Sequence, residues 1–81
     1  MSSASTLADM LKEYEMESLI NFLQKDSKLK HIKVSNFFTK FEEEKITSNS
    51  FLKLTGWEFK EYGMTLRQAL ELEDYIKGLG E

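Results

Sequence analysis

The sequence has 81 residues, of which 41% are hydrophobic and 31% charged, with a formal net charge of −3 and no cysteine. This length allows one small domain and excludes an enzyme that needs a separate cofactor-binding lobe. The lack of cysteine excludes a thiol nucleophile, a cysteine zinc site and a disulfide scaffold, and favours a reducing compartment such as the cytoplasm. No apolar run suits a membrane span, and the acidic balance gives no general attraction to nucleic acid or anionic lipid.

The spacing of apolar residues predicts an all-α fold. Proline is absent, and apolar residues recur at intervals of three and four positions, as on one face of a helix. Residues 1–6 are small and hydroxyl-rich without the pattern of a secretory signal, so we expect a disordered start and no export. Residues 7–80 are expected to form a single domain, with its core over about 16–79.

The first half of the chain contains three apolar stripes. The first covers residues 7–14, behind Thr6, which can cap a helix. The second covers residues 16–23, and it either continues the first helix or follows a bend near Glu15. The third covers residues 34–42, and its helix is expected to offer two or three of its phenylalanines to the core, Phe37, Phe38 and Phe41.

A polar, lysine-rich loop is predicted over residues 24–33, between the second and third stripes. Within it only Leu29 and Ile32 are candidates for burial.

Helix ends are clearer in the second half. Thr47 is predicted to cap a short helix or a single 3₁₀ turn around Phe51, because its hydroxyl can accept a hydrogen bond from an unpaired backbone amide. Thr55 with Glu58, and Thr65 with Gln68, have the spacing of capping boxes. Gly63 can end the helix between them. The last helix is predicted to be the longest, with a broad apolar face formed by Leu66, Ala69, Leu70, Leu72, Ile76 and Leu79.

The order of these motifs resembles the sterile alpha motif (SAM) domain. The resemblance covers about residues 16–79, and its most specific part runs from Phe51-Leu52-Lys53-Leu54-Thr55 to the Gly63-Met64 stop. It implies a five-helix bundle that acts as a non-catalytic interaction module, here with an N-terminal helical extension. Such domains commonly join head to tail, the mid-loop surface of one contacting the end-helix surface of the next. The implied partner is a second copy or another SAM domain in a scaffold or signalling protein.

Two candidate surfaces follow from the resemblance. The mid-loop candidates are Glu42, Glu43, Glu44, Asn49, Trp57, Glu58 and Glu61. The end-helix candidates are Met64, Thr65, Leu66, Arg67 and Gln68. The acids could instead be an ordinary solvated face and Arg67 an ordinary surface charge. Trp57 is expected to point partly outward as an interface anchor, or else to complete a small core.

An alternative function is binding of an RNA hairpin, since some SAM domains use a basic surface. The candidates are Lys25, Lys28, Lys30 and Lys33 of the lysine-rich loop, together with Arg67. Nucleic acid is the lesser expectation, because phosphate binding needs several cations acting together. No enzyme, metal, cofactor or small-molecule substrate is predicted. His31 lacks companion ligands, and Glu71 and Asp74 are expected on the solvent face of the last helix.

Overall fold

The computed structural model describes residues 6–80, and within them the chain is helical and contains no strand. The elements in chain order are α1 (Leu7–Leu11), α2 (Met16–Lys25), the 3₁₀ turns η1 (Ser27–Leu29) and η2 (Val34–Phe37), α3 (Phe38–Glu43), α4 (Ser48–Phe51), α5 (Gly56–Glu61) and α6 (Leu66–Leu79). The predicted all-α fold with an N-terminal helical extension and a long last helix is confirmed. Of the start expected to be disordered, residues 1–5 lie outside the described residues, and Thr6 caps α1.

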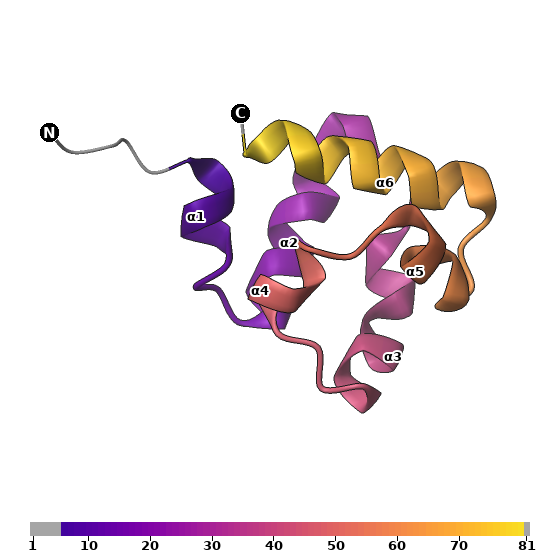
Figure 1. The fold of residues 1–81 in the computed structure, drawn as a ribbon, viewed down its shortest axis with the longest axis horizontal. Coiled ribbons are helices and arrows are strands. Elements are labelled where there is room, and N and C mark those ends of the chain that lie inside the picture. Colours follow the sequence, from indigo (N-terminus) through magenta and orange to yellow (C-terminus); the bar gives the residue numbers. More distant parts are fainter. Residues whose placement is uncertain (1–5, 81) are drawn as a thin grey trace, which may run out of the picture.

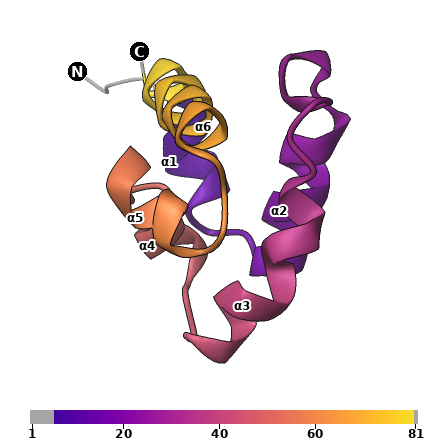
Figure 2. The same cartoon turned by 90° about the vertical axis from the view of Figure 1, so that its right-hand side faces the viewer.

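The helices form two sides joined at one end. α2 makes one side, α5 and α6 make the other, and α3 lies at the end where the two sides meet (Figure 2). α1 lies beside the C-terminal part of α6 (Figure 1), where Leu7 and Leu79 line the same surface hollow. A bend with extended backbone at Glu15 separates α1 from α2, which decides between the two possibilities left by the sequence.

Three phenylalanine rings form the centre of the core. Phe41, Phe51 and Phe59 are fully buried, and each comes from a different helix. Their rings meet edge to face, with centroids 5.2 Å apart for Phe41 and Phe51 and 5.2 Å for Phe51 and Phe59. Phe37 and Phe38 are only partly buried, so the third apolar stripe offers one fully buried phenylalanine to the core.

The lysine-rich loop is anchored as predicted. Leu29 and Ile32 are both buried, although the loop contains the turn η1.

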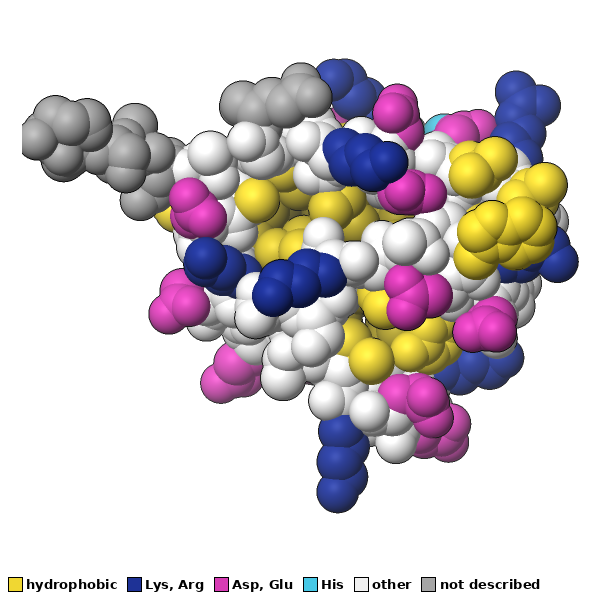
Figure 3. Space-filling view, in the orientation of Figure 1, with side chains coloured by type: hydrophobic (Ala, Val, Ile, Leu, Met, Phe, Trp, Pro, Cys, Tyr) yellow, Lys and Arg dark blue, Asp and Glu magenta, His cyan; other side chains and the backbone are white. Residues whose placement is uncertain are grey.

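The apolar face of α6 is narrower than the sequence suggested. Ala69, Leu72 and Ile76 are buried, but Leu66 and Leu70 are 43% and 50% exposed. A helix packed on one side buries a stripe roughly 100° wide, and these two leucines lie outside it. Hydrophobic side chains accordingly gather at the surface over the junction of α5 and the start of α6 (Figure 3). The broad apolar face predicted for the last helix is therefore only partly covered by the core, and Leu66 and Leu70 lie on its exposed part.

The junction of α5 and α6 leaves little room for a side chain at Gly56. A Cβ at Gly56 would lie 2.9 Å from Glu73 Oε1 and 3.0 Å from Leu70 Cδ2. The Gly56 amide instead donates a hydrogen bond of 2.7 Å to Glu73 Oε1, which ties the first residue of α5 to the middle of α6.

The predicted helix ends are confirmed. Thr47, Thr55 and Thr65 each accept a hydrogen bond from an amide of the helix that follows, and the last two form complete capping boxes. Gly63 follows α5 with a φ of 108°, a backbone conformation that side chains with a Cβ rarely adopt.

Replacing Gly63 with alanine should lower the free energy of unfolding by about 1–3 kcal/mol, because it forces an L side chain into a disfavoured backbone region. Gly78→Ala is the matched control: nothing lies within 4 Å of the added Cβ, and the site is helical. That variant should raise the free energy of unfolding by up to about 1 kcal/mol. Urea denaturation measures both, and equal effects of the two substitutions would contradict the assignment of Gly63.

Candidate functional site

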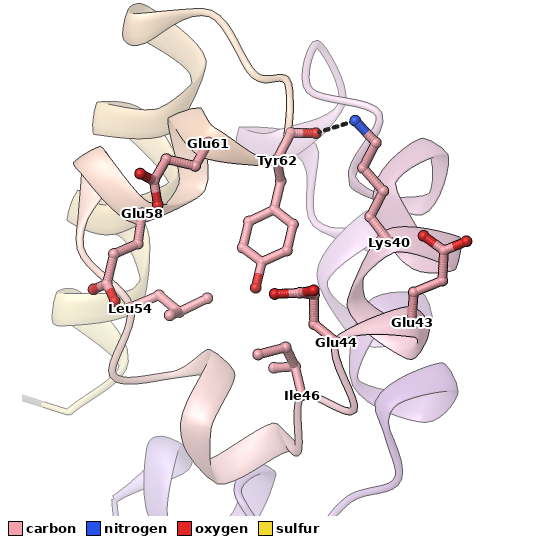
Figure 4. A pocket seen from close by; sticks show the side chains of 8 residues that line it. All are labelled: Lys40, Glu43, Glu44, Ile46, Leu54, Glu58, Glu61 and Tyr62. Atoms are coloured by element: carbon pink, nitrogen blue, oxygen red, sulfur yellow. Dashed lines mark hydrogen bonds between the residues drawn. The ribbon is translucent and has the colours of Figure 1, made fainter.

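A groove with acidic walls lies between α3 and α5. Its volume is about 490 Å³, and the side chains that line it are Lys40, Glu43, Glu44, Ile46, Leu54, Glu58, Glu61 and Tyr62 (Figure 4). We call it the acidic groove. Four of the seven mid-loop candidates therefore lie around one concavity, with an apolar floor formed by Ile46, Leu54 and the ring of Tyr62.

One wall depends on how α3 ends. The Lys45 amide donates to the Glu42 carbonyl and the Ile46 amide to the Phe41 carbonyl, both at 3.0 Å, which is the pattern of a Schellman motif. Lys45 takes the left-handed conformation that this motif needs, with a φ of 56°. The turn reverses the chain at once, so Glu44 and Ile46 both line the groove.

The opposite wall is the exposed side of α5. Glu58 and Glu61 are three residues apart on this helix, so both side chains reach the groove. Glu58 is already engaged, since it accepts from the Thr55 amide at 2.9 Å in the capping box. Glu43, Glu44 and Glu61 form no ion pair within residues 6–80. The groove thus holds three carboxylates without a cationic partner in this part of the chain.

Tyr62 reports the resulting negative field. Burial raises the pKa of its phenol, and the nearby carboxylates of Glu44, Glu58 and Glu61 raise it further, because the phenolate would be repelled by them. The Tyr62 hydroxyl points toward the Glu44 carboxylate (Figure 4). The cation of the groove, Lys40, donates from Nζ to the Tyr62 carbonyl at 3.2 Å and so stays at the upper edge.

The other three mid-loop candidates lie elsewhere. Glu42 lines a separate hollow with Met16 and Lys45, and Asn49 lines another with Lys12. Trp57 is 71% exposed and does not line the groove, so it does not complete the core.

Sequence reasoning missed four residues of the groove, Lys40, Ile46, Leu54 and Tyr62. Nothing in the sequence around these residues indicates a groove, because only the folded chain brings α3 and α5 together.

The end-helix candidates play different structural parts. Met64 is buried, so it supports this surface from beneath and offers no side chain to a partner. Thr65 and Gln68 bond each other's backbone amides at 3.1 Å in the capping box. Leu66 and Arg67 are exposed, and Arg67 Nε donates to Glu71 Oε1 at 3.2 Å.

The lysine-rich loop is fastened to α6. His31 Nε2 pairs with Glu71 Oε2, and the Tyr75 hydroxyl donates to Asp26 Oδ2 at 2.6 Å. The hydrogen bond from His31, followed by that from Arg67, lowers the pKa of Glu71. Glu71 is therefore not a free solvent-facing acid, and it brings the loop and Arg67 together. The lysines themselves are all exposed: Lys25, Lys28, Lys30 and Lys33.

Within residues 6–80, no group of three or more histidine, aspartate or glutamate side chains is placed to hold a metal ion. No helix in the same range is long and apolar enough to cross a membrane.

The capped short helices followed by one long helix define a SAM-like fold. A family model of the SAM-like domain matches residues 1–78, nearly the whole chain, and the protein therefore belongs to the SAM-like domain family. The matched range includes α1. No curated protein and no solved structure matches the chain. SAM-like domains are generally non-catalytic interaction modules. Membership of the family therefore indicates a protein-interaction module and no more specific function.

The bond between Tyr75 and Asp26 should give stability a recognisable pH dependence. Burial and the bond to Asp26 raise the pKa of Tyr75 to about 12, so its contribution is full below about pH 10 and is lost as the pH rises through 12. The bonds from Tyr75 and from the Lys28 amide lower the pKa of Asp26, so that contribution is present above about pH 4 and is lost as the pH falls.

Tyr75→Phe should therefore lower the melting temperature most between about pH 5 and pH 9, and less at either extreme. Thermal unfolding followed by circular dichroism from about pH 3 to about pH 11 measures the effect. Tyr14→Phe removes a hydroxyl from an exposed tyrosine outside the bond and serves as control. A pH-independent difference between wild type and Tyr75→Phe would contradict the proposed pairing.

Proposed function

We propose that this domain associates through SAM–SAM contacts in which the acidic groove of one domain receives the end-helix surface of another. The partner is a second copy or a different SAM domain. The observation that carries the proposal is a set of three carboxylates, Glu43, Glu44 and Glu61, that form no ion pair within the described residues 6–80 and lie around an apolar floor. Like charges gathered in this way repel one another, and a cationic group bound between them would relieve that repulsion.

The start of α6 supplies a complementary surface. Arg67 is exposed and lies in the first turn, where the helix dipole adds partial positive charge. Leu66 beside it offers an apolar side chain that suits the groove floor. A bidentate bond from the guanidinium to a groove carboxylate is the kind of charge-assisted contact that gives both strength and direction.

Contacts between two unlike surfaces do not close through a twofold axis. Repeating the contact builds a ring or an open helical chain of domains, whereas blocking one surface stops growth at a dimer. We infer from this that the domain assembles a larger scaffold or signalling protein, and the absence of cysteine from the sequence agrees with a cytoplasmic setting.

Charge reversal in either surface should weaken self-association. Glu43→Lys and Arg67→Glu should each reduce assembly about tenfold or more, because each replaces an attractive pair by a repulsive one. Both reversals suit the helix dipole, since Glu43 ends α3 and Arg67 begins α6, so folding should be retained. Sedimentation velocity over a range of protein concentrations at low salt measures the assembly.

Mixing the two single variants tests the pairing directly. The Glu43→Lys chain retains its end-helix surface and the Arg67→Glu chain retains its groove, so the mixture should recover at least a dimer. If the wild-type chain stays monomeric at high micromolar concentration, the homotypic form of the proposal is wrong. Titration with other SAM domains then tests the heterotypic form.

RNA-hairpin binding is the second candidate, and one observation favours it. Glu71 bonds both His31 and Arg67, so the lysine-rich loop and the start of α6 lie together on one surface. The acids Asp26 and Glu71 lie within the same surface and reduce its positive charge. We therefore rank it below protein association.

A gel-shift titration with a hairpin RNA distinguishes the two candidates. If RNA binds, changing both Lys28 and Lys30 to glutamate should weaken binding about tenfold or more and flatten its salt dependence, because phosphate contacts release counterions. Lys53→Glu, an exposed lysine near α4, is the control. The absence of salt-sensitive binding by the wild type would eliminate this candidate.

A further inference from the structure

Three large apolar side chains are exposed where α5 meets the start of α6. Trp57 on α5 is 71% exposed, and Leu66 and Leu70 on α6 are 43% and 50% exposed. We call this set the tryptophan patch. Hydrophobic side chains gather over this junction in the space-filling view (Figure 3). Exposed apolar residues that stand alone are ordinary on a protein surface, whereas a gathered set marks an interaction site.

Close packing of the two helices makes the patch continuous. The amide of Gly56 bonds Glu73, and the Cβ position of Gly56 lies 3.0 Å from Leu70 Cδ2, so the residue before Trp57 lies against Leu70. Leu66 and Leu70 are one helical turn apart and share a side of α6. The capping box at Thr55 fixes the direction in which α5 leaves the junction, and with it the placement of Trp57.

The core gives no reason for a tryptophan here. Phe59 on α5 and Ala69 and Leu72 on α6 are fully buried and belong to the core without any contribution from Trp57. The indole ring therefore remains largely in water in the isolated domain, where it gains little of the burial energy of an aromatic side chain. A partner that covers the ring would supply that missing burial.

The acidic groove of a second copy matches this patch in charge and in polarity. Arg67 follows Leu66 in the first turn of α6 and lies beside the patch, and the groove has carboxylate walls around a floor of Ile46, Leu54 and Tyr62. The groove and the patch use different residues of α5: Glu58 and Glu61 line the groove, whereas Trp57, one helical turn from Glu61, does not line it. A single domain therefore presents both halves of the contact at the same time.

We propose that Trp57 is the anchor of self-association, with the tryptophan patch of one copy docked on the acidic groove of the next. This inference rests on the proposed function and adds to it the residue that supplies most of the apolar contact. A tryptophan can bury about 150–250 Å², which is a large share of the roughly 800 Å² that each partner contributes to an interface of standard size. It also places Trp57 on the end-helix side of the contact, whereas the resemblance assigned it to the mid-loop side.

The sequence contains a single tryptophan, so its fluorescence reports on this site alone. As the concentration of the full chain rises, the emission maximum should move to shorter wavelength and quenching by acrylamide should decrease, in step with the assembly seen by sedimentation. Trp57→Ala should weaken assembly about tenfold or more, and Trp57→Phe should have a smaller effect. Met10→Ala is the matched control: Met10 on α1 is 54% exposed and lies outside both surfaces, so assembly should be unchanged.

The possible results separate the two proposals. If Glu43→Lys and Arg67→Glu weaken assembly while Trp57→Ala and the emission do not change, the anchor role is wrong and the proposed function stands. If Trp57→Ala prevents assembly but neither charge reversal matters, the patch binds something other than the acidic groove, and the proposal is overturned. A wild-type chain that remains monomeric overturns both the anchor role and homotypic assembly.

Discussion

The edge-to-face packing of three phenylalanines and one tyrosine sets the geometry on which both surfaces depend. Phe41 of α3 contacts Phe51 of α4 and the ring of Tyr62, whose centroid is 4.8 Å away. Tyr62 directly follows α5, so these contacts fix the separation of α3 from α5. The same tyrosine ring is part of the core on one side and part of the groove floor on the other. The packing of these core rings therefore sets the distance between the two walls of the acidic groove.

α5 shows how six residues can serve three purposes. Phe59 fills the core, Glu58 and Glu61 face the groove, and Trp57 faces the junction with α6. So short a helix would be marginal alone, since most helical stability comes from packing against the rest of the fold. Its capping box and the amide bond from Gly56 to Glu73 hold its N-terminal end. Glu58, one of the groove carboxylates, is therefore also part of the cap at the start of this helix.

Local motifs could be read from the sequence, and long-range ones could not. The caps at Thr47, Thr55 and Thr65 were predictable because each involves residues within one turn of one another. The resemblance to the SAM domain supplied the order of the helices. The groove required knowledge of which sides of α3 and α5 face each other, and the bond between His31 and Glu71 joins residues 40 positions apart. The exposure of Leu66 and Leu70 also depends on tertiary packing. The spacing of apolar residues in the sequence is the same whether or not a neighbouring helix covers a leucine at the margin of the stripe.

The two kinds of contact in the proposed interface respond differently to solution conditions. Each copy carries a net charge of −3, so two copies repel at long range, and in the proposed interface the local attraction between Arg67 and the groove opposes this repulsion. At physiological ionic strength, dissolved salt ions screen charges that are more than about 8 Å apart. This screening weakens the long-range repulsion between two copies more than it weakens a close ion pair. Burial of the tryptophan patch is not weakened by salt in this way. An interface built from both would gain its specificity from the charges and its persistence from the apolar contact, so the net negative charge of the chain is compatible with the proposed self-association.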